Sequence, residues 1–414
     1  MNRLPVFSAV LLFACGAQAE NPPREFSVTP EVIKEAPPFV TQVVVPNANC
    51  AAVSDQLSML VIGHDTPAAE NQHLAVFHLD RDGRPSGEPA WVSLPRPEVL
   101  SGNANYALGL LFHPRLPLLY VWQDIKAPPG DKQENHPEFA NYLEFDHLLI
   151  YEVKDGALEL VQTGARGTGF HCGLTGGTIG FDFAARKLFV PNAVGATSDE
   201  AGIGFFTLDE DGMPGESQER VLTQPKEKPL KVTSKNDAPN KSSRSVLMPK
   251  RHRTHRYYPS GTGWFAGSEA MVMGGYSGCM TLDFNNGGIR QSWFNLPELA
   301  GPCCVSGHPK QPAIYIALQD NNRLFQIAHA DGYVSLLPQV ASVTAAHLTG
   351  IPVVLTKQSR LAVGDTKFLH LFGLQPDGRL DGKDEKVALA SARARAITYS
   401  EKHGRLYVAV DKAN

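Results

Sequence analysis

Three stretches of the sequence share one pattern: residues 79–87 read LDRDGRPSG, residues 208–215 read LDEDGMPG and residues 374–382 read LQPDGRLDG. An Asp-Gly pair is among the strongest short signals for a hairpin turn, because glycine readily adopts the positive φ that such a turn requires. A run of alternating apolar residues precedes each pair, as in a strand with one buried face. Each stretch therefore predicts the tight turn of a β-hairpin.

Asp-Gly or Asn-Gly pairs follow alternating apolar runs at six places: Asp82-Gly83, Asp155-Gly156, Asp211-Gly212, Asn286-Gly287, Asp331-Gly332 and Asp377-Gly378. A second repeated unit consists of an apolar strand, a polar turn and a strand that carries Tyr or Phe. Its copies are residues 110–124 (LLFHPRLPLLYVWQD), 178–192 (TIGFDFAARKLFVPN), 304–320 (CVSGHPKQPAIYIALQD) and 396–411 (AITYSEKHGRLYVAVD). The last two steps between hairpin glycines are 45 and 46 residues, which is the size of one four-stranded propeller blade.

Six four-stranded units fit between Cys50 and Leu389, and the C-terminal copy supplies two more strands. We expect its missing partners from the N-terminal region, where residues 40–46 (VTQVVVP) form a good outer strand and residues 26–29 a weaker one. The sequence therefore predicts an all-β fold, a seven-bladed β-propeller whose ring is closed by one or two N-terminal strands that complete the C-terminal blade. Two β-sandwiches are the alternative, but they do not explain a regular step of about 45 residues.

The composition is that of a large, turn-rich globular domain. Of the 414 residues, 37 are Gly and 31 are Pro, 43% are hydrophobic and 19% are charged, which excludes a disordered, collagen-like or coiled-coil chain. The net charge of −4 gives no overall bias toward nucleic acid. The sequence has no HExxH, CxxCH, Walker or GxSxG motif. We expect no cofactor and no bound metal.

The first 19 residues are typical of a secretory signal peptide, with Arg3, an apolar stretch at residues 4–14 and the small-x-small site Ala17-Gln18-Ala19. We expect one domain at residues 20–414, exported to the periplasm or secreted, and monomeric. A lipoprotein anchored through Cys15 is the alternative, which the bulky Phe13 disfavours. No later apolar stretch is long enough to span a membrane. Export permits disulfides, so Cys303-Cys304 is either a strained vicinal disulfide or, as we favour, a pair of packed thiols.

The repeated motifs resemble the lactonase-type seven-bladed propellers, the superfamily that includes bacterial 6-phosphogluconolactonase and the YVTN-repeat proteins. The likeness rests on the His-Pro strand pairs, such as residues 110–124, and on the LDxDG hairpins. It implies a hydrolase that opens a sugar-derived or carboxylate lactone at the mouth of a central channel. Members of that family often carry Arg-His where an inner strand begins, and Cys303-Cys304 stand at the corresponding place in this chain.

In such a ring, the segments that enter the innermost strands and those that follow the second strands lie on one face, where propellers bind ligands. The candidate catalytic residues are His171 or His347 as general base and Arg393 and Arg395 as partners of a carboxylate, a phosphate or an oxyanion. The candidate ligand-binding residues are Asn49, Asn103, Tyr106 and Trp264, together with Arg251, Arg253 and Arg256. The alternative for each is a hydrogen bond to channel water or a neighbouring loop.

The loops that follow the second strands add further polar residues to this face: His64-Asp65, Gln123-Asp124, Asn192, Tyr276, Gln319-Asp320, Asp365 and Asp411. The recurring aspartates could bind Ca²⁺ as a ring of oxygen ligands. We favour the other interpretation, in which each carboxylate caps its loop by accepting backbone N–H groups.

Two predicted insertions, residues 124–146 and 222–260, fall on the same face. Between Lys226 and Arg256 lie ten Lys or Arg and two acidic residues, which suggests an acidic partner such as a polyanionic glycan, an anionic membrane surface or the body of the protein. The alternative, which we favour, is a solvated flexible loop. Export argues against nucleic acid. Two functions stay open: a lactonase-like hydrolase of a small anionic substrate, and a non-catalytic scaffold that binds a protein or polyanionic ligand through the basic insertion.

Overall fold

The computed structural model describes residues 24–27, 31–33, 35–64, 72–95, 104–126, 147–166, 179–181, 186–193, 201–222, 259–268, 270–275, 279–283, 290–294, 303–318, 323–330, 333–342, 350–365, 367–389, 394 and 396–410. These residues form β-strands and the turns between them, which confirms the all-β prediction. In this part of the chain no helix is long and apolar enough to cross a membrane.

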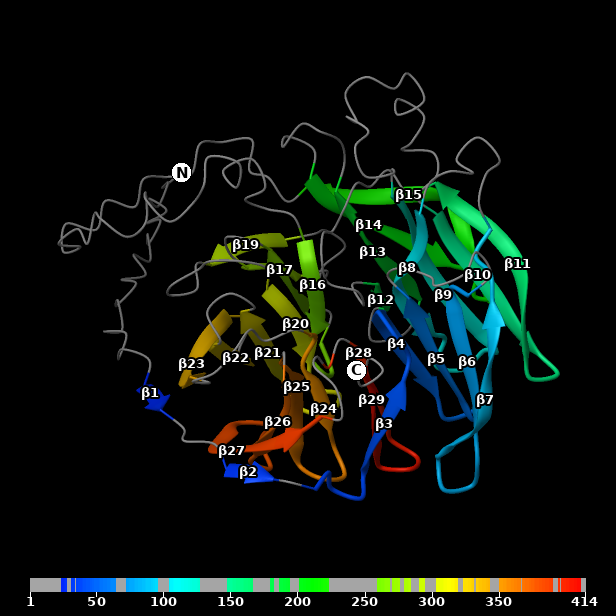
Figure 1. The fold of residues 1–414 in the computed structure, drawn as a ribbon. Helices are drawn as coiled ribbons and strands as arrows, with labels where there is room; N and C mark the ends of the chain where they lie inside the picture. Colours follow the sequence, from blue (N-terminus) through cyan, green and yellow to red (C-terminus); the bar gives the residue numbers. More distant parts are fainter. Residues whose placement is uncertain are drawn as a thin grey trace, which may run out of the picture.

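The strands form seven separate sheets (Figure 1). The first sheet contains β4 (Ala48–Ser54), β5 (Met59–His64), β6 (Leu74–Leu79) and β7 (Pro85–Val92). The second contains β8 (Ala104–Phe112), β9 (Leu118–Lys126), β10 (His147–Lys154) and β11 (Ala157–Arg166). The third contains β12 (Gly180–Phe181), β13 (Lys187–Ala193), β14 (Ala201–Leu208) and β15 (Pro214–Leu222). The fourth contains β16 (Pro259–Trp264), β17 (Ala270–Gly275), β18 (Cys279–Asp283) and β19 (Arg290–Phe294).

The last three sheets also take strands from the N-terminal region. The fifth contains β20 (Cys303–Gly307), β21 (Ala313–Leu318), β22 (Arg323–Ala330), β23 (Tyr333–Ser342) and β1 (Arg24–Ser27). The sixth contains β24 (Val353–Leu355), β25 (Arg360–Gly364), β26 (Phe368–Leu374), β27 (Leu380–Ala388) and β2 (Glu31–Ile33). The seventh contains β28 (Ala396–Ser400), β29 (Arg405–Val410) and β3 (Val40–Val44).

Consecutive sheets pack face to face through shared hydrophobic clusters. Separate clusters join the first sheet to the second, the second to the third, the fourth to the fifth, the fifth to the sixth and the sixth to the seventh. Another cluster joins the seventh sheet to the first. Between the third and fourth sheets, the ring of Phe189 packs edge to face against that of Trp264, with centroids 5.1 Å apart. The first strands of neighbouring sheets contact each other: β28 contacts β4, and β4 contacts β8.

The strand β5 shows how one sequence fills two of these clusters. All six of its residues are buried, and successive side chains of a strand point to opposite faces. Met59 and Val61 therefore join the cluster toward the second sheet, while Leu60 and Ile62 join the cluster toward the seventh. The outer strand β7 is instead mostly exposed or half-buried, which fits its polar sequence.

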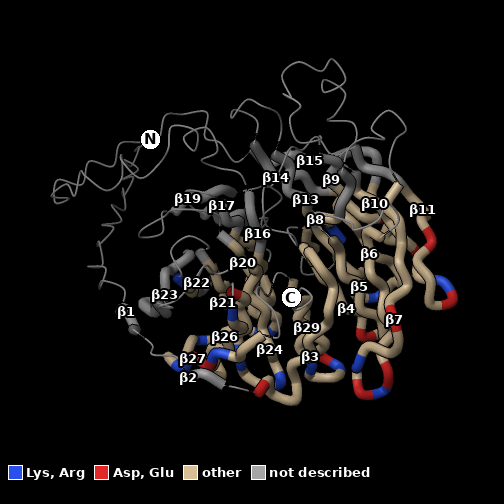
Figure 2. Tube along the Cα trace, viewed as in Figure 1, with Lys and Arg blue, Asp and Glu red and all other residues tan. Residues whose placement is uncertain are grey.

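The Asp-Gly turns lie between the third and fourth strands of their sheets. At Asp155-Gly156 both residues have positive φ, 50° and 82°, as a two-residue turn of type I′ requires. In the LDxDG turns the first aspartate is the acceptor: Asp80 Oδ1 accepts the N–H groups of Asp82 at 2.9 Å and Arg84 at 2.8 Å. Asp209 binds its own turn in the same way. Figure 2 shows charged residues at the β6–β7 and β10–β11 turns, whereas the strands beside them are mostly uncharged.

The histidines of the two described His-Pro turns stabilise those turns. His113 Nδ1 accepts the N–H groups of Arg115 and Leu116. His308 Nδ1 does the same for the two residues that follow Pro309. Ser54 and Ser400 accept turn N–H groups through their hydroxyls at the same point of their sheets. The His-Pro motif therefore has a capping role here.

Three tyrosines of second strands join one sheet to the next. Tyr120 donates its hydroxyl to the carbonyl oxygen of Gly212, and Tyr315 donates to that of Gly378, both at 2.6 Å. Tyr407 makes the same bond to Gly83 at 2.6 Å, from the seventh sheet to the first. Each acceptor is the glycine of an Asp-Gly turn, so the two repeated motifs of the sequence bind each other across sheet boundaries.

The N-terminal region departs from its prediction. As expected, β3 pairs with β29, in a parallel register that places Val43 opposite Ala409. Residues 26–29 were proposed as a second strand of the last sheet, and the described residues 26 and 27 do not join it. Their described part belongs to β1, which pairs with β23 in the fifth sheet, with Phe26 opposite Ala341. The strand β2, not predicted, pairs with β27 in the sixth sheet. The strands β1, β2 and β3 therefore lie at the outer edges of three consecutive sheets, one strand in each sheet.

Strands extend into both predicted insertions, so each insertion is shorter than expected. The strand β9 continues to Lys126, β15 ends at Leu222 and β16 begins at Pro259. Residues 124–126, 222 and 259–260 therefore belong to strands. Residues 127–146 and 223–258, which include the basic stretch, lie outside the described residues, as do the predicted signal peptide and residues 182–185.

Candidate functional site

The described turns between first and second strands use their polar groups to bind one another. At one end, the turns between first and second strands are bound to each other across four sheets. Lys310 Nζ lies 2.9 Å from Glu401 Oε1, and Thr356 donates its hydroxyl to the other oxygen of that carboxylate. Ser400 donates its hydroxyl to Asp55. Because the polar groups of these turns bind one another, we expect a ligand site at the opposite end.

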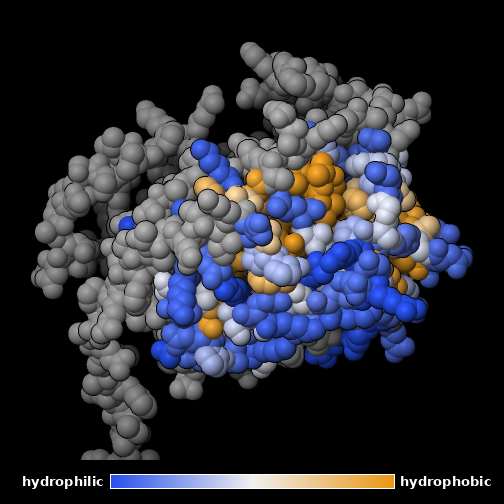
Figure 3. All heavy atoms as spheres, turned by 60° about the horizontal axis from the view of Figure 1, so that its bottom comes forward, coloured by the Kyte–Doolittle hydropathy of each residue, from blue (hydrophilic) through white to orange (hydrophobic). Residues whose placement is uncertain are grey.

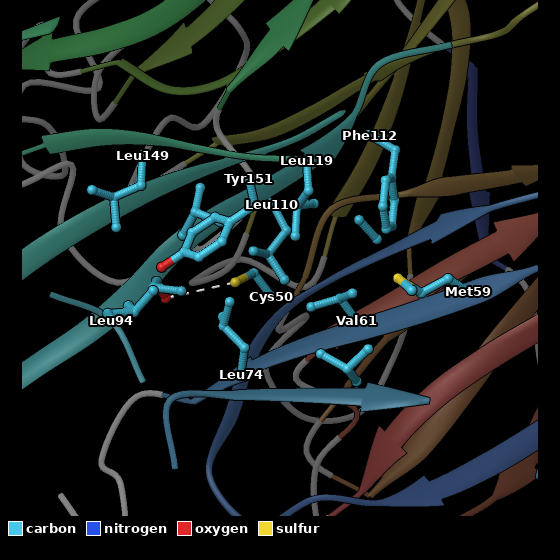
Figure 4. Close-up of a cluster of buried hydrophobic side chains, with 14 residues drawn as sticks. Cys50, Met59, Val61, Leu74, Leu94, Leu110, Phe112, Leu119, Leu149 and Tyr151 are labelled. Atoms are coloured by element: carbon cyan, nitrogen blue, oxygen red, sulfur yellow. Dashed lines mark hydrogen bonds between the residues drawn. The ribbon is translucent and has the colours of Figure 1, made fainter. Parts of the chain in front are cut away.

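At the opposite end the first strands begin and the second strands finish. Asn49 is at the start of β4, beside a register shift between Ala48 and Cys50. Its side-chain amide donates to Ala107 O of the second sheet at 3.0 Å. The buried Cys50 thiol contacts the same carbonyl at 3.6 Å, among Leu94, Leu110 and Tyr151 (Figure 4). Asn49, predicted to bind ligand, therefore lies at the expected end and also holds two sheets together.

His64 ends β5 at this same edge of the first sheet, opposite Ala48. It is only 2% exposed, and neither ring nitrogen has a hydrogen-bond partner among the described residues. Its ring lies 5.0 Å from that of Trp91. Burial lowers the pKa of His64 below its ordinary value, so the ring is neutral at pH 7. A buried imidazole without hydrogen bonds is costly, and it retains one donor and one acceptor for a ligand.

A buried histidine between two aspartates occupies the sixth sheet. His370 Nε2 lies 2.8 Å from Asp365 Oδ2, and its Nδ1 lies 3.0 Å from Asp384 Oδ2. Burial alone would lower the pKa of His370, but hydrogen bonds to the two carboxylates outweigh it and the pKa is raised. For Asp365, burial would raise the pKa, yet the bonds from His370 and from two backbone N–H groups lower it.

Asp365 accepts the N–H groups of Lys367 at 2.5 Å and Phe368 at 2.6 Å, so it caps the loop after β25, as the preferred interpretation of the recurring aspartates predicted. The side chains of Asp365, His370 and Asp384 are all essentially inaccessible to solvent. A substrate cannot reach this histidine, and we assign the cluster a structural role. Among the described residues no group of His, Cys, Asp and Glu could hold a metal ion.

Ala394 lies between Arg393 and Arg395, the two predicted site residues, and it is hydrogen-bonded to Asp365 of this cluster. It is 1% exposed, and its N–H donates to Asp365 O at 3.3 Å. Its carbonyl oxygen lies so close to Gly364 that a Cβ at that position would be 2.5 Å away. The backbone between Arg393 and Arg395 is therefore held at the predicted ligand-binding end.

Most of the other predicted site residues are outside the described part of the chain: His171, His347, Arg393, Arg395, Asn103, Arg251, Arg253 and Arg256. Tyr106 is the third residue of β8, opposite Asp124 of β9, at the expected end. Among the polar residues predicted on this face but not assigned to the site, His64 is buried and has ring nitrogens without a hydrogen-bond partner among the described residues. The sequence feature that marks His64 is its position directly after the wholly apolar run MLVIG.

Trp264 was predicted at the start of an inner strand, and that placement is wrong. It is the last residue of β16, beside the turn to β17 and thus at the opposite end from Asn49. Its carbonyl oxygen approaches Gly307 of the fifth sheet, where a Cβ would be 2.1 Å away. The run PSGTGW contains two glycines and a proline, residues that weaken a strand signal, so the sequence placed the strand too late.

Comparison with solved structures identifies the architecture. The periplasmic gluconolactonase PpgL of Pseudomonas aeruginosa superposes with a TM-score of 0.52 at 12% identity, over 85% of this chain and 96% of that one. A Bacteroides fragilis protein provisionally named a 6-phosphogluconolactonase gives 0.53 at 10% identity, over 86% and 89%. The fold is that of a β-propeller. The WD40 repeats of RRP9 give 0.51 at 10% identity, over 88% of each chain.

These identities are too low to transfer an activity, and the similarity concerns the propeller fold alone. No protein-family profile and no curated protein sequence matches the chain. The function must therefore be argued from the residues of this propeller.

Proposed function

We propose that residues 20–414 form one exported domain, a closed seven-bladed propeller that follows a signal peptide at residues 1–19. The seven sheets would be the blades. The contact of β28 with β4 and the hydrophobic cluster between the seventh and first sheets support closure. So does the parallel pairing of β3 with β29, which combines strands from both chain ends in one sheet. The likeness to a periplasmic protein agrees with export.

Within this ring we propose a lactonase-like hydrolase that opens a sugar-derived or carboxylate lactone at the mouth of the channel. The observation that supports the proposal is the hydrogen bond from Ala394 N–H to Asp365 O, which holds the backbone between Arg393 and Arg395 at the end of the sheets where the mouth of the channel would lie. Two guanidinium groups there would bind the negative charge of the substrate and stabilise the oxyanion formed during attack on the carbonyl carbon.

The chemistry requires one base and no cofactor. His171 or His347 would take a proton from the attacking water. The carbonyl carbon–ring oxygen bond would then break, and the ring oxygen would be protonated to give the open hydroxy acid. Asn49, Asn103 and Tyr106 would contact the ligand at the same face. Asn49 can accept through its amide oxygen while its nitrogen is bound to Ala107 O.

The test is lactone opening by the purified protein, followed as acid release in a pH-stat with gluconolactone and a phosphorylated analogue. We expect hydrolysis above the buffer rate, a large loss in a His171→Ala/His347→Ala double variant and a raised KM in Arg395→Ala. His78→Ala, at an exposed position of β6, is the matched control and should keep full activity. Equal rates for wild type and the double variant would contradict the proposal.

The uneven distribution of charge along the sequence favours a second function. Ten Lys or Arg against two acidic residues between positions 226 and 256 leave the rest of the chain acidic, so this insertion can serve as the contact surface of a non-catalytic scaffold for a protein or polyanionic ligand. The test is binding to heparin and to vesicles containing anionic lipid, with and without residues 226–256. Retention that falls steeply with salt and disappears on deletion supports the scaffold function, and unchanged retention contradicts it.

A further inference from the structure

The seventh and first sheets meet at a seam that contains strands from both ends of the chain. The strands β28 and β29 come from the C-terminal region, and β3 from the N-terminal region pairs with β29. From β3 the chain passes to β4 of the first sheet through residues 45–47. The first strands of the two sheets, β28 and β4, are in contact. The seam between the seventh and first sheets is therefore the place where the proposed ring closes.

Hydrogen bonds join the two sheets at the end of the seam that carries the turns. Tyr407 donates its hydroxyl to Gly83 O. The hydroxyl of Ser400 and the N–H of Lys402 both donate to the carboxylate of Asp55. These turns lie on the side of the molecule at the bottom of Figure 1, whose surface is mostly hydrophilic where its atoms are coloured (Figure 3). The turn end of the seam is thus held by specific polar contacts.

His64 lies in the same seam at the opposite end. It is opposite Ala48 in the register of β5 with β4. It follows Leu60 and Ile62 at alternate positions of β5, so its side chain shares their face, which packs toward the seventh sheet. Trp91, whose ring lies 5.0 Å from the imidazole, packs against the same cluster. The chain that crosses from β3 to β4 therefore enters the first sheet beside His64.

The described surroundings of His64 would not stabilise a positive charge on its ring. The residue is 2% exposed, and neither ring nitrogen has a hydrogen-bond partner in the described part of the chain. The cluster on its face, which includes Ala396 and Ala409 of the seventh sheet, is hydrophobic. Burial lowers the pKa of His64. An imidazolium at this place would be a buried charge without a partner, which is costly.

The titratable neighbour of His64 on its own sheet is His73. The carbonyl oxygen of His73 accepts the N–H of His64 at 3.0 Å, and its Nδ1 accepts the N–H of Leu94 at 3.1 Å. The Nδ1 atom of His73 is therefore already used as an acceptor. Three charged residues that are adjacent in sequence to the strands of the seam lie outside the described residues: Asp65, Arg395 and Asp411.

We propose that His64 makes this seam an acid-sensitive latch, in which protonation of the imidazole separates the seventh sheet from the first at the end where the first strands begin. A ring that has left the seam binds the proton with its ordinary pKa of 6.5, whereas the buried ring has a lowered pKa. The latch is therefore closed above pH 6.5 and loosens as the pH falls below that value toward the lowered pKa of the closed form.

The loosened end is the end where the candidate ligand site lies, so acid would change the shape of that site. This consequence rests on the proposed function, whereas the latch itself depends only on the packing of His64 in the seam. The hydrogen bonds of Tyr407 and Asp55 hold the other end, so the separation stays local.

The test is hydrogen exchange of the full chain at about pH 7.5 and about pH 5, read by mass spectrometry and corrected for the intrinsic rate at each pH. We expect the amides of β5, β28 and β29 to lose about fivefold or more of their protection at the lower pH, as opening linked to one proton requires. The strands β25 and β26 are the internal reference, because the raised pKa of His370 favours its protonated form there. Unchanged protection at the seam, or an equal loss in the reference strands, would overturn the proposal.

The variants separate His64 from its neighbour. His64→Leu removes the titrating ring, so the seam should keep its protection at about pH 5. His64→Gln also cannot titrate and decides the question if His64→Leu fails to fold. His73→Asn is the matched control, because it removes the other imidazole while its side-chain oxygen can accept the N–H of Leu94, and it should respond to pH as wild type does. A wild-type response in the His64 variants, or a response abolished by His73→Asn, would show that His64 is not the latch.

Discussion

Tyr407 donates its hydroxyl to the carbonyl oxygen of Gly83 at 2.6 Å, in a buried hydrogen bond between residues 324 positions apart in the chain. Burial, the largest influence, raises the pKa of Tyr407 to about 12, although the charge of Arg405 acts in the opposite direction, so the hydroxyl keeps its proton at every physiological pH. The bond joins the C-terminal sheet to the first, and Tyr120 and Tyr315 make the equivalent bond between other sheets.

Removing this hydroxyl should destabilise the fold. Tyr407→Phe keeps the ring in its cluster but leaves the Gly83 carbonyl without that donor, which costs ~1–3 kcal/mol for a buried acceptor. We expect a lower urea midpoint with an unchanged m value. Tyr120→Phe is the matched comparison, because the same bond is lost between the second and third sheets. A Tyr407→Phe midpoint equal to that of wild type would show that the bond contributes nothing to closure.

The His370 cluster predicts a pH dependence of stability. Because hydrogen bonds to Asp365 and Asp384 raise the pKa of His370 above its ordinary 6.5 despite burial, the folded chain binds this proton more tightly than the unfolded chain. The resulting stability is fully present below pH 6.5 and is lost as the pH rises through the raised folded-state pKa. We expect Tm to fall over that range in wild type and to change less there in His370→Gln.

The same variant tests the strength of the cluster. His370→Gln leaves two buried carboxylates without the imidazolium between them, and breaking such a buried pair costs about 3 kcal/mol. Asp384→Asn keeps a polar group at its place and should cost less at pH 6. If His370→Gln matches wild type in midpoint and in pH profile, the cluster is not charged in the folded protein.

His64 predicts a pH dependence of stability with the opposite sign. Burial lowers its pKa below 6.5, so stability from the neutral ring is present above pH 6.5 and decreases as the pH falls toward the lowered folded-state value. His64→Leu removes a buried polar group without hydrogen bonds, and we expect equal or up to ~2 kcal/mol higher stability. A lower stability of His64→Leu than of wild type would mean that the imidazole is hydrogen-bonded in solution. If the variant is stable but loses ligand affinity, His64 belongs to the site.

The local part of this fold could be predicted because it is encoded in short motifs. The Asp155-Gly156 turn needs two residues with positive φ, and the strand–turn–strand unit at residues 110–124 needs only alternation and a polar turn. The pairing of residues 40–44 with the C-terminal copy followed from counting strands. The Tyr407–Gly83 bond was not predictable, because no local pattern says which turn lies beside which strand.

Weak or distant signals account for what the sequence missed. Residues 24–27 and 31–33 are too short to show a period, so their addition to the fifth and sixth sheets depends on edges that only the folded chain presents. Trp264 was placed at the wrong end of β16 because its glycines hide the strand. Asp365 was recognised as a loop cap, but its bond to His370 joins two strands through side chains, which periodicity does not report.

The central claim is that strands from both chain ends close the ring, with β3 as the N-terminal contribution. Val43 lies opposite Ala409 in the parallel register of β3 and β29, so a Val43→Cys/Ala409→Cys variant should form a disulfide within one chain on mild oxidation, identified by peptide mass mapping. A Phe26→Cys/Ala409→Cys variant should form none, because Phe26 pairs in the fifth sheet. Failure of the first pair to cross-link, or efficient cross-linking of the second, would contradict the account.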